Sequence, residues 1–196
     1  MSSRTLVISR TLNDEQAGRR AHVVAEAMAL ADEGGYDAVV MKAVADGSGV
    51  ALATLYRWFA SKDHLLTEVL LAWGDELSGS LAADPPSTGD AADRVAATLG
   101  AVMEVAGSRP RLASAVVAAV LSVDRGSLDP QGDFHEMVAG WIGIALGDAE
   151  VPERDAVIQV LEHVCFSAII GLATGRQTTE HATAELTTAA RLLLRK

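Results

Sequence analysis

The sequence contains a single cysteine, Cys165, which excludes an internal disulfide framework and a multi-cysteine zinc site. Prolines are also few, five in 196 residues, whereas alanine and leucine are abundant. Because alanine and leucine favour helices and proline interrupts them, this composition predicts a helical protein. Cys165 itself lies in an apolar segment, and we interpret it as a small buried core residue.

The sequence also lacks long apolar runs and recognisable catalytic groupings. No run reaches the roughly 18 apolar residues of a membrane span, and no charged-then-apolar signal peptide opens the chain. We therefore expect a soluble, cytoplasmic protein with no membrane partner. There is no glycine-rich phosphate loop, the histidines are scattered, and His163 and Cys165 do not share a helical face. We accordingly predict no metal, no cofactor and no enzymatic activity.

The net charge of −10 is unevenly distributed. Residues 1–64 carry seven basic and eight acidic side chains, whereas residues 65–196 carry nine and eighteen. The acidity therefore belongs to the second part of the chain. A phosphate-bearing partner would have to meet a local group of donors in the first part.

Apolar residues recur at helical spacing along most of the chain, and turn residues separate the segments. Residues 1–12 have no clear periodicity and are predicted to form a flexible arm. Ser61 is a predicted helix cap, and the Pro/Gly/Ser-rich stretch 84–90 is the clearest loop. We predict an all-α fold of about nine helices, with approximate limits from 14 to the glycine pair at 34–35, then 41–47, 51–59, 61–83, 90–106, 110–122, 129–147, 152–174 and 178–195.

A short helix, a turn at Gly49 and a second short helix are typical of a helix-turn-helix. On a helical wheel Leu55 and Phe59 lie one turn apart and define the inward face of the second helix. Ala53 and Arg57 lie opposite and face solvent. Small and hydrogen-bonding groups on an exposed helix suit a DNA groove, where a small side chain permits close approach.

The flanks of this helix carry further donors. Thr54 and Arg57 can donate to base edges or phosphates, and Tyr56 can donate its hydroxyl to a phosphate. Lys62 adds a cation at a helix N-terminus, where backbone N–H groups also favour phosphate. The alternative for Tyr56 is a buried tyrosine with a satisfied hydroxyl, and Trp58 fits either the core or the contact surface.

Residues 41–66, MKAVADGSGVALATLYRWFASKDHLL, resemble the DNA-binding signature of the TetR family of transcriptional regulators. The similarity lies in Gly49-Val50, the triplet 54–56, Phe59 and the Ser61-Lys62 pair. Met41 departs from the pattern, because the family usually has Thr or Ser there to cap the helix and touch a phosphate. The resemblance implies a homodimer on a near-palindromic double-stranded DNA operator, contacted by Lys42, Ala53, Thr54, Tyr56, Arg57, Trp58 and Lys62.

A further resemblance, concentrated in the DNA-binding third, is to actinobacterial KstR-type regulators of cholesterol catabolism. That similarity rests on GGYDAVVMKAVAD, TLYRWFASKDHLL and the terminal ARLLL. It implies a steroid or a fatty-acyl coenzyme A thioester as the small-molecule effector.

The helix predicted over 152–174 is apolar almost all round, so it must be buried on more than one side. One side can pack in its own domain, and the other can pair with a second copy together with the last helix. The alternative is a single central helix in a monomer. The predicted dimer interface comprises Val157, Leu161, Val164, Ala168, Leu172, Leu186, Ala190 and Leu193.

The helices predicted over 90–147 are the expected site of an effector pocket. Methionine and aromatic side chains adapt to varied apolar ligands, although at helical spacing such residues also form ordinary cores. The predicted pocket wall comprises Leu99, Met103, Val116, Val120, Phe134, Met137, Trp141 and Phe166.

These patterns divide the chain into an arm at 1–12, a helix-turn-helix DNA-binding domain at 13–62 and an effector-binding and dimerisation domain at 63–196. The leading functional hypothesis is a repressor that a small apolar or acyl-CoA-like effector releases from its operator. The alternative is a dimeric small-molecule-binding protein without specific DNA binding.

Overall fold

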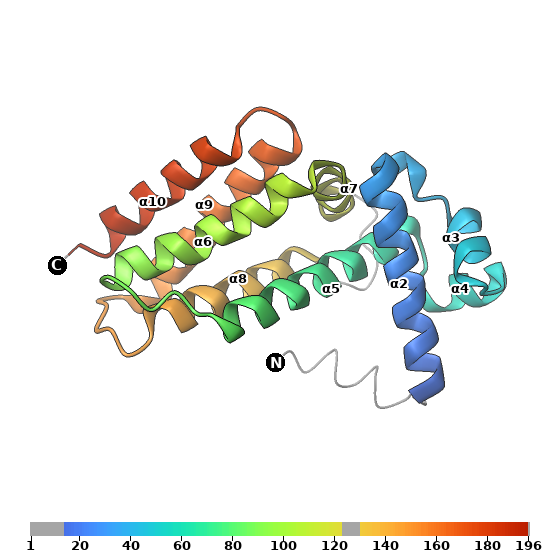
Figure 1. The fold of residues 1–196 in the computed structure, drawn as a ribbon, viewed down its shortest axis with the longest axis horizontal. Coiled ribbons are helices and arrows are strands. Elements are labelled where there is room, and N and C mark those ends of the chain that lie inside the picture. The colour runs from blue at the N-terminus through green and yellow to red at the C-terminus, as the bar shows by residue number, and fades with distance from the viewer. Residues whose placement is uncertain (1–13, 123–129, 196) are drawn as a thin grey trace.

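The computed structural model describes residues 14–122 and 130–195 of the chain. Within these ranges every regular element is helical and no strand occurs, which confirms the predicted all-α class. The arm expected at 1–12 lies outside the described residues. Figure 1 shows a small group of helices at one end and an elongated bundle at the other.

We call the small group the head. Its α3 ends at Gly49, whose φ of 67° places it in the left-handed region, and the Gly49 N–H caps the helix on the carbonyl of Ala45. The turn at Gly49 was predicted, whereas the short 3-10 helix η1 was not. The head consists of α2 (Asp14–Gly34), η1 (Tyr36–Ala38), α3 (Met41–Ser48) and α4 (Leu52–Trp58).

Helix α5 (Lys62–Ala83) leaves the head and runs the length of the bundle (Figure 1). Its N-cap is Ser61, whose Oγ accepts a hydrogen bond from the His64 N–H at 3.1 Å, as the sequence predicts. The other bundle helices, which with α5 we call the body, begin and end within two residues of the predicted limits. They are α6 (Ala91–Ser108), α7 (Pro110–Leu121), α8 (Pro130–Leu146), α9 (Arg154–Ala173) and α10 (Thr179–Leu193).

Two clusters of buried side chains hold these helices together. The first joins the head to the start of α5 and to α7, with Leu55 and Phe59 fully buried in it. The second fills the body between α6, α8, α9 and α10. Leu70, Val105 and Leu172 pack against both clusters, so the head is attached to the body through a continuous apolar core.

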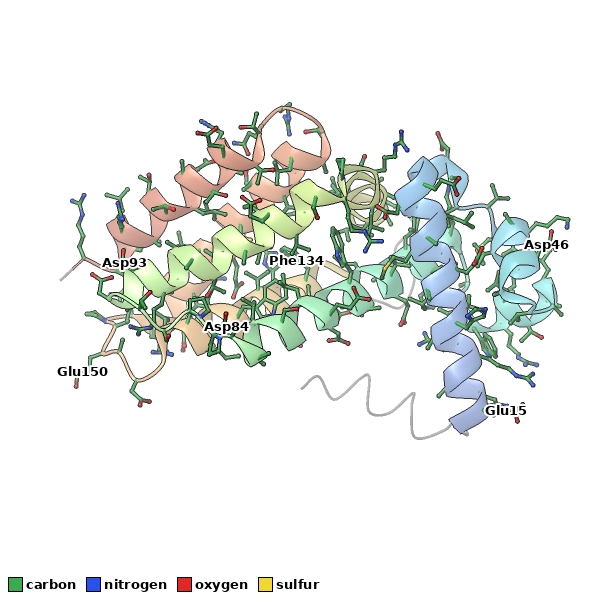
Figure 2. All side chains as sticks on the ribbon, viewed as in Figure 1. Glu15, Asp46, Asp84, Asp93, Phe134 and Glu150 are labelled. Carbon is green, nitrogen blue, oxygen red and sulfur yellow. The ribbon has the colours of Figure 1, made fainter. Side chains whose placement is uncertain are left out.

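Helix α9 combines an apolar sequence with an open surface. Among the described residues it is the one helix whose length and composition would suit a membrane span. Only 28% of its most apolar 18-residue window is buried. Three acidic residues of the body, Asp84, Asp93 and Glu150, lie toward the end that is away from α3 and α4 (Figure 2).

Candidate functional site

Helix α4 exposes the face that the helical wheel predicts. Leu55 is fully buried, while Ala53 and Arg57 are exposed on the opposite side. Tyr56 is 51% exposed, which rules out the alternative of a buried tyrosine. Thr54 is half-buried beside them. The outer face of α4 therefore presents a small side chain, a hydroxyl, a phenol and a guanidinium together.

Trp58, which the sequence left undecided, is half-buried and packs against the first core cluster. Lys42 is exposed on α3 and pairs with Asp46 at 2.7 Å, with side-chain exposures of 72% and 67%. Such an exposed pair is weak, so the Lys42 ammonium can exchange Asp46 for a phosphate. Met41 is 8% exposed and fills the core, and the N-cap of α3, Val40, offers no side-chain hydrogen bond.

The start of α5 is tied to η1 through Tyr36. Lys62 Nζ donates to the Tyr36 carbonyl at 3.2 Å and lies 3.5 Å from the centroid of the Tyr36 ring. The Tyr36 hydroxyl donates to Asp63 Oδ1 at 2.6 Å. That hydrogen bond, with burial and the nearby carboxylates, raises the pKa of Tyr36 to about 12. Lys62 is thus held at the helix N-terminus, at the edge of the head.

A second group fixes α4 against α2 and α5. Arg20 Nη2 lies 2.8 Å from Glu68 Oε1, and the Arg20 guanidinium carbon is 4.8 Å from the centroid of the Phe59 ring. His64 Nδ1 accepts from the Ala60 N–H at 3.2 Å. Burial alone would raise the pKa of Glu68, but hydrogen bonds from His64 and Arg20 and the positive charge of Arg20 lower it. The sequence predicts the inward position of Phe59, but it does not predict the pairing of Arg20 with Glu68.

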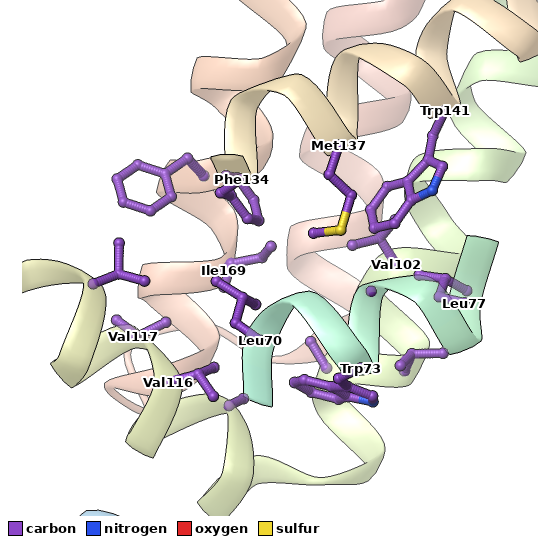
Figure 3. A pocket seen from close by; sticks show the side chains of 16 residues that line it. Leu70, Trp73, Leu77, Val102, Val116, Val117, Phe134, Met137, Trp141 and Ile169 are labelled. Atoms are coloured by element: carbon purple, nitrogen blue, oxygen red, sulfur yellow. The ribbon is translucent and has the colours of Figure 1, made fainter. Parts of the chain in front are cut away.

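An apolar cavity of about 50 Å³ lies in the body, walled by residues of α5, α6, α7, α8 and α9 (Figure 3). The structure brings most of the predicted wall together there. Trp141 belongs to this wall, and its Nε1–H donates to Ser78 Oγ at 2.8 Å. The predicted residues that line the cavity are Val116, Val120, Phe134, Met137, Trp141 and Phe166.

Leu99 and Met103, also predicted for the wall, do not line the cavity. Both are fully buried in the second core cluster, and α6 turns Val102, Val105 and Ala106 toward the cavity instead. The sequence also missed the contribution of α5. Its apolar spacing was recognised, but nothing in the sequence shows which side of that helix faces the other body helices. The α5 residues in the wall are Leu70, Trp73, Gly74 and Leu77.

Comparison with known proteins identifies this arrangement. The family model described as bacterial regulatory proteins, tetR family, matches residues 23–69, which include the helix-turn-helix. The HTH-type transcriptional repressor KstR of Mycobacterium tuberculosis (strain ATCC 25618 / H37Rv) is 29% identical over 198 residues, covering 99% of this chain and 89% of the repressor. A TetR transcriptional regulator from Rhodococcus sp. RHA1 superposes with a TM-score of 0.82 at 27% identity, covering 93% of this chain and 99% of that one. The chain carries a tetR-family DNA-binding region and is similar to TetR-family transcriptional regulators over most of its length.

Its fold extends to more distant proteins. FadR from Bacillus subtilis, solved in complex with stearoyl-CoA, superposes with a TM-score of 0.54 at 13% identity, covering 89% of this chain and 97% of that one. With a helix-turn-helix that matches the tetR-family model, the chain is a DNA-binding transcriptional regulator.

In this regulator, half of the residues predicted for the dimer interface need correction. Leu161, Leu186 and Ala190 are fully buried in the protomer, and Ala168 is 1% exposed. Their side chains fill the second core cluster, so they have no surface to offer a second copy. The other four are half-buried: Val157, Val164, Leu172 and Leu193. The exposed large apolar residues on these helices are Val160, at 46%, and Leu192, at 56%.

Two buried titratable groups of the body, Cys165 and Glu162, lie outside the cavity wall. Cys165 is fully buried, and burial raises the pKa of its thiol to about 12. Glu162 is 8% exposed, with Oε2 3.5 Å from His135 Nδ1. Burial raises the pKa of Glu162, and the charges of His135 and His163 oppose that shift. In the described part of the chain, no group of three or more His, Cys, Asp or Glu side chains is placed to hold a metal ion.

Proposed function

We propose that this regulator is a dimeric repressor whose operator affinity falls when a small apolar effector occupies the cavity of the body. The observation that carries the proposal is the sharing of side chains between the cavity wall and the core of the head. Trp73, Ala106, Ala113 and Val116 belong to both. A change in the cavity therefore reaches the head through direct contacts.

The outer face of α4 is the reading surface in this proposal. Tyr56, with its exposed hydroxyl, donates to a phosphate, and Arg57 and Thr54 reach base edges or the backbone. Lys42 and Lys62 flank α4 and add phosphate contacts. Trp58 contributes an edge of its ring, and Ala53 permits close approach.

A second copy supplies the other reading helix. Two reading helices must reach half-sites about 34–36 Å apart, or a multiple of that distance, on a near-palindromic operator. The partly open, apolar α9 is the surface that fits a two-fold interface between copies, together with α10. The half-buried Val157, Val164, Leu172 and Leu193 and the exposed Val160 are candidates for it.

The small size of the cavity explains how an effector would release the repressor from its operator. Its volume of about 50 Å³ is far below the roughly 300–1,000 Å³ of ligand pockets, so an effector must displace the wall. Displacing Trp73 or Val116 moves side chains of α5 and α7, two of the helices against which α2 packs. The effector thus favours a conformer in which the two reading helices no longer match the operator.

The wall is apolar, which favours an apolar effector or the acyl part of an acyl-CoA. The complex of FadR with stearoyl-CoA and the likeness to KstR support this class. These relatives are transcriptional regulators, which argues against an enzyme. The alternative is a dimeric small-molecule-binding protein without specific DNA binding. Sequence-specific DNA binding distinguishes the two functions, and in both cases we propose a cytoplasmic protein.

Fluorescence anisotropy with DNA from upstream of the protein's own gene tests the proposal. We expect sequence-selective binding whose affinity falls steeply with salt, because phosphate contacts release counterions. Extracted cellular lipids should weaken that binding. Salt-insensitive binding, or equal affinity for unrelated DNA, would overturn the proposal in favour of the alternative.

A further inference from the structure

A wide surface groove of about 950 Å³ lies on the opposite side of α5 and α8 from the apolar cavity. Residues of α2, α5 and α8 line most of this groove. Met137 and Trp141 on α8 belong to the walls of both the groove and the cavity. These two side chains therefore mark the place where the cavity comes nearest to the surface.

The two side chains differ in how easily they can move. Trp141 is 6% exposed and is held by its hydrogen bond to Ser78 on α5. Met137 has an unbranched, flexible side chain and is held by packing alone. In Figure 3 the Met137 side chain extends from α8 toward α5, beside Trp141. Met137 is thus the movable part of the wall.

Glycine at position 74 makes room for Met137. A Cβ added to Gly74 would overlap the Met137 sulfur and lie 2.7 Å from its Cε. The thioether therefore occupies the space that a side chain at position 74 would take. At this point the gap between α5 and α8 is filled by the flexible Met137 side chain alone, because Gly74 contributes no side chain.

We propose that an elongated apolar effector enters and leaves the cavity between α5 and α8 past Met137, and that its outer end, which stays in the groove, is uncharged. This inference rests on the proposed function, in which the cavity holds the effector, and it narrows the effector class given there to molecules with an uncharged outer end, which excludes an acyl-CoA. Met137 then sets the rate of effector exchange, and the groove selects the head group.

The charge of the groove argues for the uncharged end. Carboxylates of Asp75, Glu76 and Glu136 lie in its wall. The two arginines in its described wall already have partners, since Arg20 lies 2.8 Å from Glu68 and Arg109 lies 3.1 Å from Asp32. An anionic head group would meet these carboxylates and would have to break an existing ion pair to gain a cation.

Stopped-flow fluorescence with the uncharged probe N-phenyl-1-naphthylamine tests the route, since Trp73 and Trp141 in the wall can transfer energy to it. Met137→Ala should raise both the association and dissociation rates by about tenfold, as expected for a barrier lowered by about 1.4 kcal/mol. Adding Gly74→Ala to this variant returns a methyl group to the vacated space and should slow exchange again. Met137→Leu, which conserves most of the volume, should accelerate exchange less.

Two substitutions serve as matched controls. Gly79→Ala adds a methyl group on the same helix with nothing within 4 Å of it, and Val117→Ala trims the cavity wall on α7, away from the gap. Neither should change the exchange rates by more than about twofold. Unchanged rates in Met137→Ala and Met137→Leu, or equal acceleration by Val117→Ala, would overturn the route.

Displacement of the probe by 1-decanol, decanoate and decanoyl-CoA tests the head group. We expect 1-decanol to displace the probe at the lowest concentration. Displacement by decanoyl-CoA or decanoate at lower concentrations would overturn the uncharged end, and an absence of energy transfer in the wild type would overturn the whole inference. Operator anisotropy on the same samples reports separately on the proposed function, because DNA binding does not require the probe.

Discussion

At the scale of single residues, the two tyrosines have opposite environments. Tyr56 is 51% exposed on α4, whereas Tyr36 is half-buried and donates its hydroxyl to Asp63 at 2.6 Å. Exposure therefore separates a side chain available to DNA from one that holds the head together. Removing each hydroxyl in turn distinguishes these two roles with the same chemical change.

Tyr56→Phe should weaken operator binding by about tenfold, since a hydrogen bond to a charged group contributes about 1.5 kcal/mol. The free energy of unfolding should not change, because the hydroxyl has no partner within the described residues. Tyr36→Phe should instead lower the free energy of unfolding by about 1 kcal/mol. Anisotropy and urea unfolding of both variants provide the measurements, and a loss of stability in Tyr56→Phe would contradict the assignment.

Glu68 gives the head a dependence on pH. Its pKa is lowered in the folded state, so its stabilising contribution is present above the pKa of the unfolded chain and is lost as the pH falls. Glu68→Gln removes the carboxylate and leaves Arg20 without its ion-pair partner. We expect the variant to be less stable than the wild type at pH 7, with a smaller difference at pH 4. Urea unfolding at both values measures it, and a difference that grows toward pH 4 would refute it.

At the scale of helices, the sequence predicts where a helix begins and ends better than it predicts which side of the helix is buried. Ser61 and Gly49 mark boundaries through chemistry that is local to the chain, and both appear where expected. Helix α9 is apolar almost all round, so the sequence does not show that Leu161 and Ala168 turn inward while Val160 turns outward. That distinction depends on α8 and α10, which contact α9 only in the folded chain.

The same limit applies to the cavity. Six of the eight predicted wall residues line it, because methionine and aromatic side chains at helical spacing mark an adaptable apolar interior. The opposing wall from α5 was missed, and so was Gly74. A glycine carries no apolar signal, and its role depends on the approach of Met137 from another helix. The structure of the pair could therefore not be predicted from either position alone.

At Gly49 a single backbone angle ends α3 and sets the turn that leads into α4. Its φ of 67° lies in the left-handed region, where an added Cβ costs about 1–2 kcal/mol. Gly49→Ala should lower the free energy of unfolding by that amount and weaken operator binding, because α4 follows this turn. Gly79→Ala, in open space within α5, should be neutral or slightly stabilising. Equal effects of the two substitutions in urea unfolding would disprove the explanation.

At the scale of the whole molecule, most of the negative charge lies outside the head. Residues 65–196 carry nine basic and eighteen acidic side chains, and three of these carboxylates, on Asp84, Asp93 and Glu150, lie away from α3 and α4 (Figure 2). A second copy paired through α9 and α10 would add its own reading helix on the same DNA. In the proposed dimer, operator affinity would therefore depend on dimerisation.

Val160→Glu tests that dependence, since Val160 is 46% exposed near the middle of the open face of α9. A charge buried between two copies without a partner is costly, so we expect a monomer by sedimentation at micromolar concentrations. Operator affinity should fall by about a hundredfold, as expected when the second half-site no longer adds to binding. Ile144→Glu on α8 is the matched control, because Ile144 is 67% exposed away from α9 and should leave the dimer intact. A dimer that survives Val160→Glu would place the interface on another surface and return α9 to the role of a central helix in each protomer.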